Sequence, residues 1–69
     1  MLRQVVDSQS LRSIGYDKRT RTLEVEFKSG SLYRYANVPL AVWSDLLQAQ
    51  SKGRFFQQHV RDHFPTTRL

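Results

Sequence analysis

The chain has 69 residues, no cysteine and a formal net charge of +5, from eleven Lys and Arg against six Asp and Glu. This length allows one domain with a thin hydrophobic core. The lack of cysteine excludes disulfides and thiolate-bound metals, and in so small a domain it favours the reducing cytoplasm. The sequence has no apolar run of about 18 residues and no signal-peptide pattern, so we expect a cytoplasmic protein that does not enter the membrane.

Alternating apolar and polar residues in the N-terminal half predict short β-strands. The predicted strands are residues 10–16, 22–27 and 31–35, with Val5 and Val6 as a short fourth strand. Residues 17–20 form a polar turn that opens on an aspartate, as many turns do. In the clearest strand, residues 22–27, the apolar side chains point to the core, and Glu24 and Glu26 are expected to face water.

The turn that follows allows two registers for the hairpin. A two-residue turn pairs Phe27 with Leu32 and puts the tyrosines of the returning strand on the wet face. A three-residue loop that ends in a left-handed Gly30 instead pairs Val25 with Tyr33.

We favour the three-residue loop because it gives both the tyrosines and the charged residues favourable surroundings. It pairs Leu23 with Tyr35, so that both tyrosine rings stay on the core face. It also sets Arg34 opposite Glu24, which is a favourable cross-strand pair.

The pattern changes to a period of 3.6 at Pro39, which suits the first turn of a helix because it has no N–H group to leave unpaired. We expect a first helix that closes at residues 48–50 and carries one apolar stripe. Ser51 is a favourable N-cap for a second helix, which Pro65 stops. The apolar positions of that helix are Phe56, Val60 and Phe64. Residues 66–69 are expected to fray.

These elements predict an α+β fold. A three- to four-stranded antiparallel meander is followed by two short helices that pack on one face of the sheet. All 69 residues belong to a single domain, with a core of about residues 8–64.

An ordered set of short motifs runs through residues 8–65. It comprises Ser10, Ile14-Gly15-Tyr16-Asp17, Thr22-Leu23-x-Val25-x-Phe27, Gly30, Tyr33-x-Tyr35, Val38-Pro39, Ser51-Lys52-Gly53-Arg54-Phe55-Phe56 and His59-Val60-Arg61-Asp62. This set resembles the KTSC domain family, and its order is more specific than any one motif. That family is named for an extension at the C-terminus of some lysyl-tRNA synthetases, and it also occurs as a free-standing small bacterial protein.

The resemblance implies a domain of unknown specific role, and the attachment to tRNA synthetases implies RNA binding. The family motif falls on Tyr33, Tyr35, Ser51, Gly53 and Phe56. Gln57 stands where an asparagine is expected and Phe64 where a tyrosine is expected. A ligand contact that relatives make through either of these polar groups is therefore in doubt here.

Tyr33 and Tyr35 allow two interpretations. Paired aromatic side chains on a strand can stack nucleobases, as they do in other sheet-based RNA-binding proteins. Alternatively, both rings fill the small core and hold their hydroxyl groups at its edge. The favoured register supports the second interpretation, so we expect the motif to be mainly structural.

The candidate nucleic-acid-binding residues are basic side chains in the first turn, on the returning strand and on the second helix. They are Lys18, Arg19, Arg21, Arg34, Lys52, Arg54 and Arg61. Lys52 and Arg54 oppose the helix dipole, which suggests an anion at that helix end, held with the free backbone N–H groups beside Gly53. The alternative is a Ser-capped helix whose glycine packs tightly against the preceding helix.

The sequence offers little for catalysis or metal binding. His59 and His63 are four residues apart, a spacing that metal ligands use, but zinc requires three or four protein ligands. No nucleophile–base constellation and no glycine-rich phosphate loop is present. We therefore expect no enzymatic activity, no metal and no cofactor.

Two functions remain open. The first is a module that binds nucleic acid, RNA before DNA, through backbone phosphates and with a salt-sensitive affinity. The second is a protein-interaction module or homodimer that uses an apolar patch beside the helices or a free sheet edge. Clustering of the basic residues on one face would favour the first function, and their dispersal beside a large apolar patch would favour the second.

Overall fold

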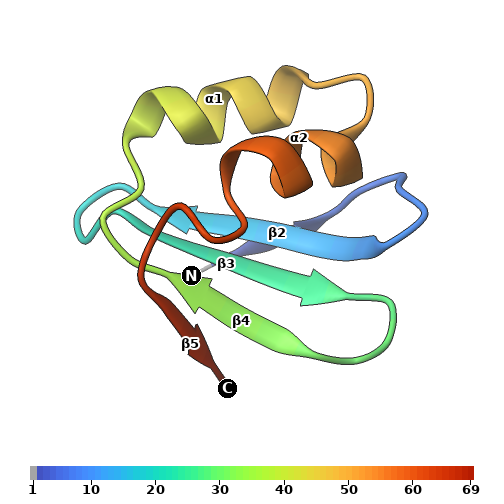
Figure 1. Cartoon of the computed structure of the whole chain (residues 1–69), viewed down its shortest axis with the longest axis horizontal. Coiled ribbons are helices and arrows are strands. Elements are labelled where there is room, and N and C mark those ends of the chain that lie inside the picture. Colours follow the sequence, from blue (N-terminus) through green and yellow to red (C-terminus); the bar gives the residue numbers. More distant parts are fainter. Residues whose placement is uncertain (1) are drawn as a thin grey trace.

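The computed structural model describes residues 2–69 and shows one antiparallel sheet with two helices on the same face (Figure 1). The strands are β1 (Arg3–Val5), β2 (Leu11–Asp17), β3 (Thr22–Phe27), β4 (Leu32–Tyr35) and β5 (Thr66–Arg68), and the helices are α1 (Leu40–Gln48) and α2 (Lys52–His59). The α+β class is confirmed, with five strands in place of the three or four predicted.

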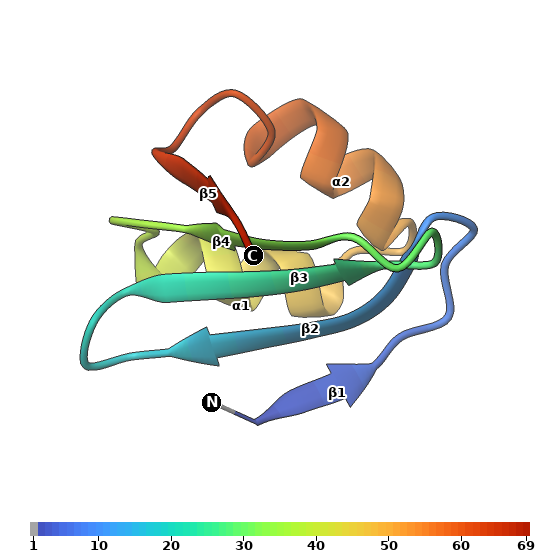
Figure 2. The same cartoon turned by 90° about the horizontal axis from the view of Figure 1, so that it is seen from below.

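The strands lie side by side in chain order, from β1 at one edge to β5 at the other (Figure 2). In this view α1 lies behind the middle of the sheet, and α2 lies towards β4 and β5. No helix within residues 2–69 is long and apolar enough to cross a membrane.

The end of the chain forms an edge strand, and our expectation that residues 66–69 fray is wrong. β5 pairs with β4, and the backbone N–H of Leu69 donates to the carbonyl of Leu32 at 2.8 Å. The N–H of Ala36 donates to the carbonyl of Pro65 at the other end of this ladder. The physical reason is that the outer edge of β4 carries unpaired backbone groups, which the extended chain after Pro65 satisfies.

Helix α2 ends earlier than predicted. The N–H groups of Val60 and Arg61 both donate to the carbonyl of Phe56, and Asp62 adopts a left-handed φ of 65°. The chain therefore leaves the helix after His59 and returns towards the sheet through a series of turns. Phe64 still packs against the core, but it does so from this loop and not from the helix.

The hairpin between β3 and β4 has the favoured register. Val25 pairs with Tyr33, and the loop of residues 28–30 closes with Gly30 at a φ of 98°. Arg34 lies opposite Glu24, and its Nε is 3.3 Å from the carboxylate.

The sheet face away from the helices carries a charged row, and here the prediction that Glu24 faces water is wrong. Glu24 is only 6% exposed because Arg34 covers one carboxylate oxygen and Arg3 lies 3.7 Å from the other. Arg3 reaches over Gly15, where an added Cβ would lie 2.8 Å from its Cγ. The absence of a side chain at Gly15 thus allows β1 to approach and cover the glutamate.

The core lies between the other sheet face and the helices. Its buried apolar residues are Leu11, Ile14, Leu23, Val25, Tyr35, Val38, Leu46, Phe56 and Val60. At its edge Tyr16 stacks on Trp43, with ring centroids 5.4 Å apart.

Candidate functional site

The predicted basic residues do not gather on one face, so the set as a whole does not show the clustering that would favour a nucleic-acid surface. Residues 18–21 form the β2–β3 turn, whereas Lys52 and Arg54 begin α2 beside the β1–β2 loop. Successive turns of an antiparallel meander lie at opposite ends of the sheet, so these two groups are far apart, as Figure 1 shows. Arg34 lies on the face away from the helices, bound to Glu24.

The start of α2 is a capped helix end that packs against a loop. Ser51 caps it as predicted, because its Oγ accepts a hydrogen bond from the N–H of Arg54. Lys52 turns back and donates to the carbonyl of Ala49 at 3.1 Å. An added Cβ at Gly53 would lie 3.0 Å from Ser10 Oγ and 3.2 Å from Ser8 Oγ. Gly53 is therefore packed against the β1–β2 loop and not against the preceding helix.

Two hollows lie next to each other beside α2 and share Gln57 as a lining residue, and we call the two together the groove. The first, which we call the aromatic hollow, has a volume of about 420 Å³. Its aromatic side chains are Phe27, Tyr33, Tyr35 and Phe56, and its polar side chains include Ser31, Arg61, Asp62 and Thr66. The second, the polar hollow, has a volume of about 700 Å³. It lies among residues 7–10, Lys28 and residues 50–54.

The floor of the aromatic hollow is a chain of edge-to-face ring contacts. The centroid of Phe56 lies 5.3 Å from that of Phe27 and 5.5 Å from that of Tyr35. Phe27 also meets Tyr33 at 5.6 Å with an interplanar angle of 84°. These are the ring arrangements that aromatic pairs prefer. Phe56 and Tyr35 are only 2% and 4% exposed, so the partly exposed rings of the hollow are those of Phe27 and Tyr33.

Both tyrosines of the family motif pack in or against the core and also line the aromatic hollow. Tyr35 is 4% exposed and Tyr33 is half-buried, and both lie on the helix-facing side of the sheet. Burial, with a smaller effect from Tyr33, raises the pKa of Tyr35 to about 12, although the positive charge of Arg61 acts in the opposite direction. The Tyr35 hydroxyl therefore keeps its proton to a higher pH than an exposed tyrosine does.

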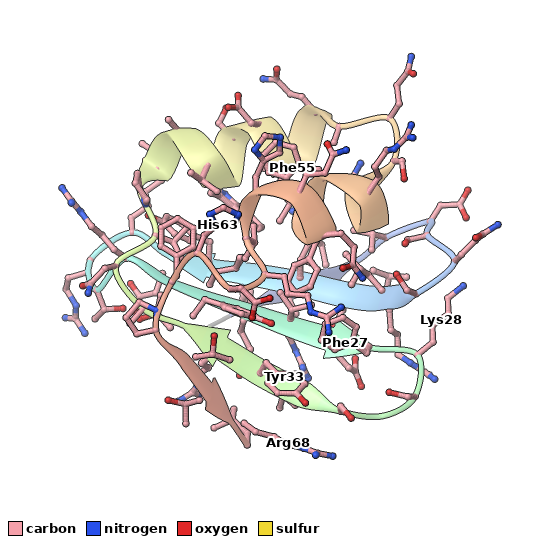
Figure 3. The ribbon with its side chains drawn as sticks, in the orientation of Figure 1. Phe27, Lys28, Tyr33, Phe55, His63 and Arg68 are labelled. Atoms are coloured by element: carbon pink, nitrogen blue, oxygen red, sulfur yellow. The ribbon has the colours of Figure 1, made fainter. Side chains whose placement is uncertain are left out.

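Two guanidinium groups flank the aromatic hollow. Arg61 donates to Gln57 Oε1 at 3.0 Å along the end of α2. Arg68 on β5 holds its guanidinium carbon 5.8 Å from the ring centroid of Tyr33. Figure 3 shows Tyr33 and Arg68 next to each other on β4 and β5, with Phe27 further towards α2.

The groove brings together some predicted residues and some that sequence reasoning missed. Lys52, Arg54 and Arg61 line it as predicted residues of the second helix, whereas Lys28 and Arg68 were not predicted. Sequence reasoning does not predict Arg68 as a binding residue, because it expects residues 66–69 to fray. The β-branched pair Thr66–Thr67 after a proline was the available signal for a strand.

The two histidines do not come together with other metal ligands. The His59 ring lies against that of Phe55, with centroids 4.6 Å apart and an interplanar angle of 38°. Within residues 2–69, no group of three or more His, Cys, Asp or Glu side chains could hold a metal ion.

Comparison with known proteins places this arrangement in a family. The model of the KTSC domain matches residues 7–64. The chain belongs to the KTSC domain family. A crystal structure of a KTSC domain protein from Yersinia pestis superposes with a TM-score of 0.94 and 38% identity, covering 99% of this chain and 96% of that one.

Relatives of two kinds share the KTSC sequence. An uncharacterised protein of Stutzerimonas stutzeri is 55% identical over 58 residues, which cover 84% of this chain and 82% of that protein. A lysine–tRNA ligase of Nostoc punctiforme is 39% identical over 59 residues, which cover 86% of this chain but only 10% of the ligase. The family therefore includes small proteins and a short segment of a much longer enzyme.

Proposed function

We propose that this KTSC domain is a non-catalytic module that binds a short single-stranded segment of RNA in the groove along α2. The observation that carries the proposal is a hollow with two partly exposed aromatic rings, Phe27 and Tyr33, and with basic side chains near it. Lys28 and Arg54 line the polar hollow, and Arg61 and Arg68 flank the aromatic hollow. Bases stack on aromatic side chains while phosphates meet basic groups, and this combination is the usual way of binding single strands.

The charge of the whole chain supports an anionic partner. A net charge of +5 on 69 residues attracts polyanions over a distance and makes their affinity depend on salt. The similarity to a segment of lysine–tRNA ligases, enzymes named for a tRNA substrate, favours RNA among the possible anions. An RNA partner also agrees with the cytoplasmic location that the cysteine-free sequence predicts.

The proposal is tested by NMR titration of the ¹⁵N-labelled protein with a single-stranded RNA hexamer, at low and at physiological salt. We expect amide shifts in the hairpin residues 28–31 and in residues 54–61, which weaken as salt increases. A duplex RNA of equal length serves as the control, since its bases are not free to stack. Absence of shifts with the single strand at low salt, or equal shifts spread over the β2–β3 turn, would contradict the proposal.

A second candidate function, protein interaction, has one specific observation in its favour. Leu2, just before β1, is 96% exposed and Val5, the last residue of β1, is 84% exposed, and β1 is an edge of the sheet. An edge strand can pair with an extended peptide or with a second copy of the chain. Shifts of the β1 amides with protein concentration, together with no response to RNA, would favour this candidate.

A further inference from the structure

We propose that Arg68 is a clamp that holds one nucleobase against the ring of Tyr33. This inference rests on the proposed function and adds to it a binding residue and the chemical class of its ligand, a planar purine or pyrimidine ring. Arg68 lies directly opposite Tyr33 in the β4–β5 pairing, so both side chains project from the same sheet face. The guanidinium carbon of Arg68 lies 5.8 Å from the Tyr33 ring centroid.

The clamp has room to open. A base inserted between two planar groups requires a separation of roughly 7 Å, which is twice the stacking distance between carbon atoms. The guanidinium therefore has to move outward by only a small amount. Arg68 is exposed on a three-residue edge strand, and its bond to Ser31 Oγ is long at 3.4 Å. Neither the contact with the Tyr33 ring nor the hydrogen bond to Ser31 holds the Arg68 side chain firmly.

Tyr33, the other half of the clamp, is held in place. Its ring meets Phe27 edge to face, and its centroid lies 6.5 Å from that of Tyr35. A fixed ring and a movable planar cation make a site that closes on a flat ligand. Ser31 and Tyr35 line the same hollow, and each carries a hydroxyl group of the kind that pairs with the edge of a base.

The chemistry requires arginine at this position. A guanidinium group is planar and stacks on aromatic faces, whereas the lysine ammonium is a hydrated point charge on a flexible stem. Arg61, in the turn after α2, differs from Arg68 in that it already donates a 3.0 Å hydrogen bond to the side chain of Gln57 on α2. We therefore assign Arg61 to a phosphate and Arg68 to a base.

The test compares Arg68→Lys and Arg68→Ala with the wild type in RNA affinity. The probes are a single-stranded uridine hexamer and a hexamer of equal charge whose sugars carry no base. We expect both substitutions to weaken uridine binding by about tenfold, as loss of one stacked base does. Binding of the abasic hexamer should change little in Arg68→Lys, because the charge is retained. Arg19→Ala, in the distant β2–β3 turn, is the matched control for removal of one exposed arginine.

The outcomes separate the clamp from the wider proposal. If the wild type does not bind the uridine hexamer, the proposed function fails and the clamp fails with it. If the wild type binds but Arg68→Lys binds as tightly, the residue acts only through its charge and the clamp alone is overturned. The amide shifts of Arg34 and Leu69 in the free variants show that β5 remains paired, so a loss of affinity is not a loss of the strand.

Discussion

At the scale of single residues, Tyr35 combines two roles that the sequence presents as alternatives. Its ring belongs to the buried core, and its side chain also lines the aromatic hollow. The register that places Val25 opposite Tyr33 and Leu23 opposite Tyr35 is predictable, because a glycine in the loop and the alternation of apolar residues both favour it. The hollow itself is not predictable, because it depends on where α2 and β5 lie.

Tyr35 predicts a specific pH dependence of stability. Its pKa is raised from 10.0 to about 12 in the folded protein, so the unfolded chain loses this proton first as pH rises. The free energy of unfolding should therefore fall between about pH 10 and pH 12. In Tyr35→Phe this part of the decline should be absent, as measured by urea unfolding at each pH.

The matched control for this measurement is Tyr33→Phe, which removes a neighbouring phenol and keeps the buried one. It should retain the wild-type decline, and titration of lysines is common to all three proteins. An equal decline in Tyr35→Phe and the wild type would show that the Tyr35 hydroxyl is solvated as in a free tyrosine.

At the scale of elements, sequence reasoning predicts the strands and helix ends that are determined by the residues within them. Residues 22–27 alternate cleanly and form β3, and Ser51 caps α2 as its chemistry predicts. The end of α2 and strand β5 depend on tertiary structure. Residues 66–69 are too few to show a period, and they become a strand only because β4 offers them an unpaired edge.

Removal of β5 should therefore cost both stability and binding. A chain that ends at Pro65 loses the ladder to β4, which should lower the free energy of unfolding by about 1–3 kcal/mol. It should also lose RNA affinity, because Arg68 and one wall of the aromatic hollow are gone. Urea unfolding measures the first effect, and NMR titration measures the second.

Arg68→Ala is the reference for that truncation, since it removes the side chain and keeps the ladder. The two variants should bind RNA about equally weakly but differ in stability. A truncated chain as stable as the full one would mean that the β4–β5 pairing contributes nothing in solution.

At the scale of the whole molecule, net charge predicts the class of partner but not the place where it binds. The basic residues of the sequence divide between the two ends of the sheet and its two faces. Arg61 lines the hollow that has aromatic side chains, whereas Lys28, Lys52 and Arg54 line the polar hollow beside it. Sequence spacing could not separate these groups, because the distance between the β2–β3 turn and the start of α2 is set by the meander.

This division allows a comparison of two double variants that each remove two positive charges. The double variant Lys28→Ala/Arg54→Ala should weaken RNA binding by about tenfold at physiological salt and reduce the salt slope by about 2. The double variant Lys18→Ala/Arg19→Ala removes the same charge at the other end of the sheet and should change affinity by no more than about twofold. Isothermal titration calorimetry at several salt concentrations gives both values. Equal losses in the two variants would show that binding follows net charge and has no preferred groove.

The positions of β1 and β5 at opposite edges of the sheet also determine where a tether or tag can be attached to the domain. Arg3 starts β1 beside Gly15, at the edge of the sheet opposite β5, and no residue of β1 lines the aromatic hollow. A tether, a surface linker or an affinity tag attached before β1 therefore leaves the aromatic hollow accessible. An extension after β5 starts at the C-terminal end of that edge strand (Figure 1), one residue beyond Arg68, which pairs with Tyr33 of the aromatic hollow. Immobilisation through the N-terminus therefore suits measurements of binding, whereas a C-terminal tag would itself compete for the site.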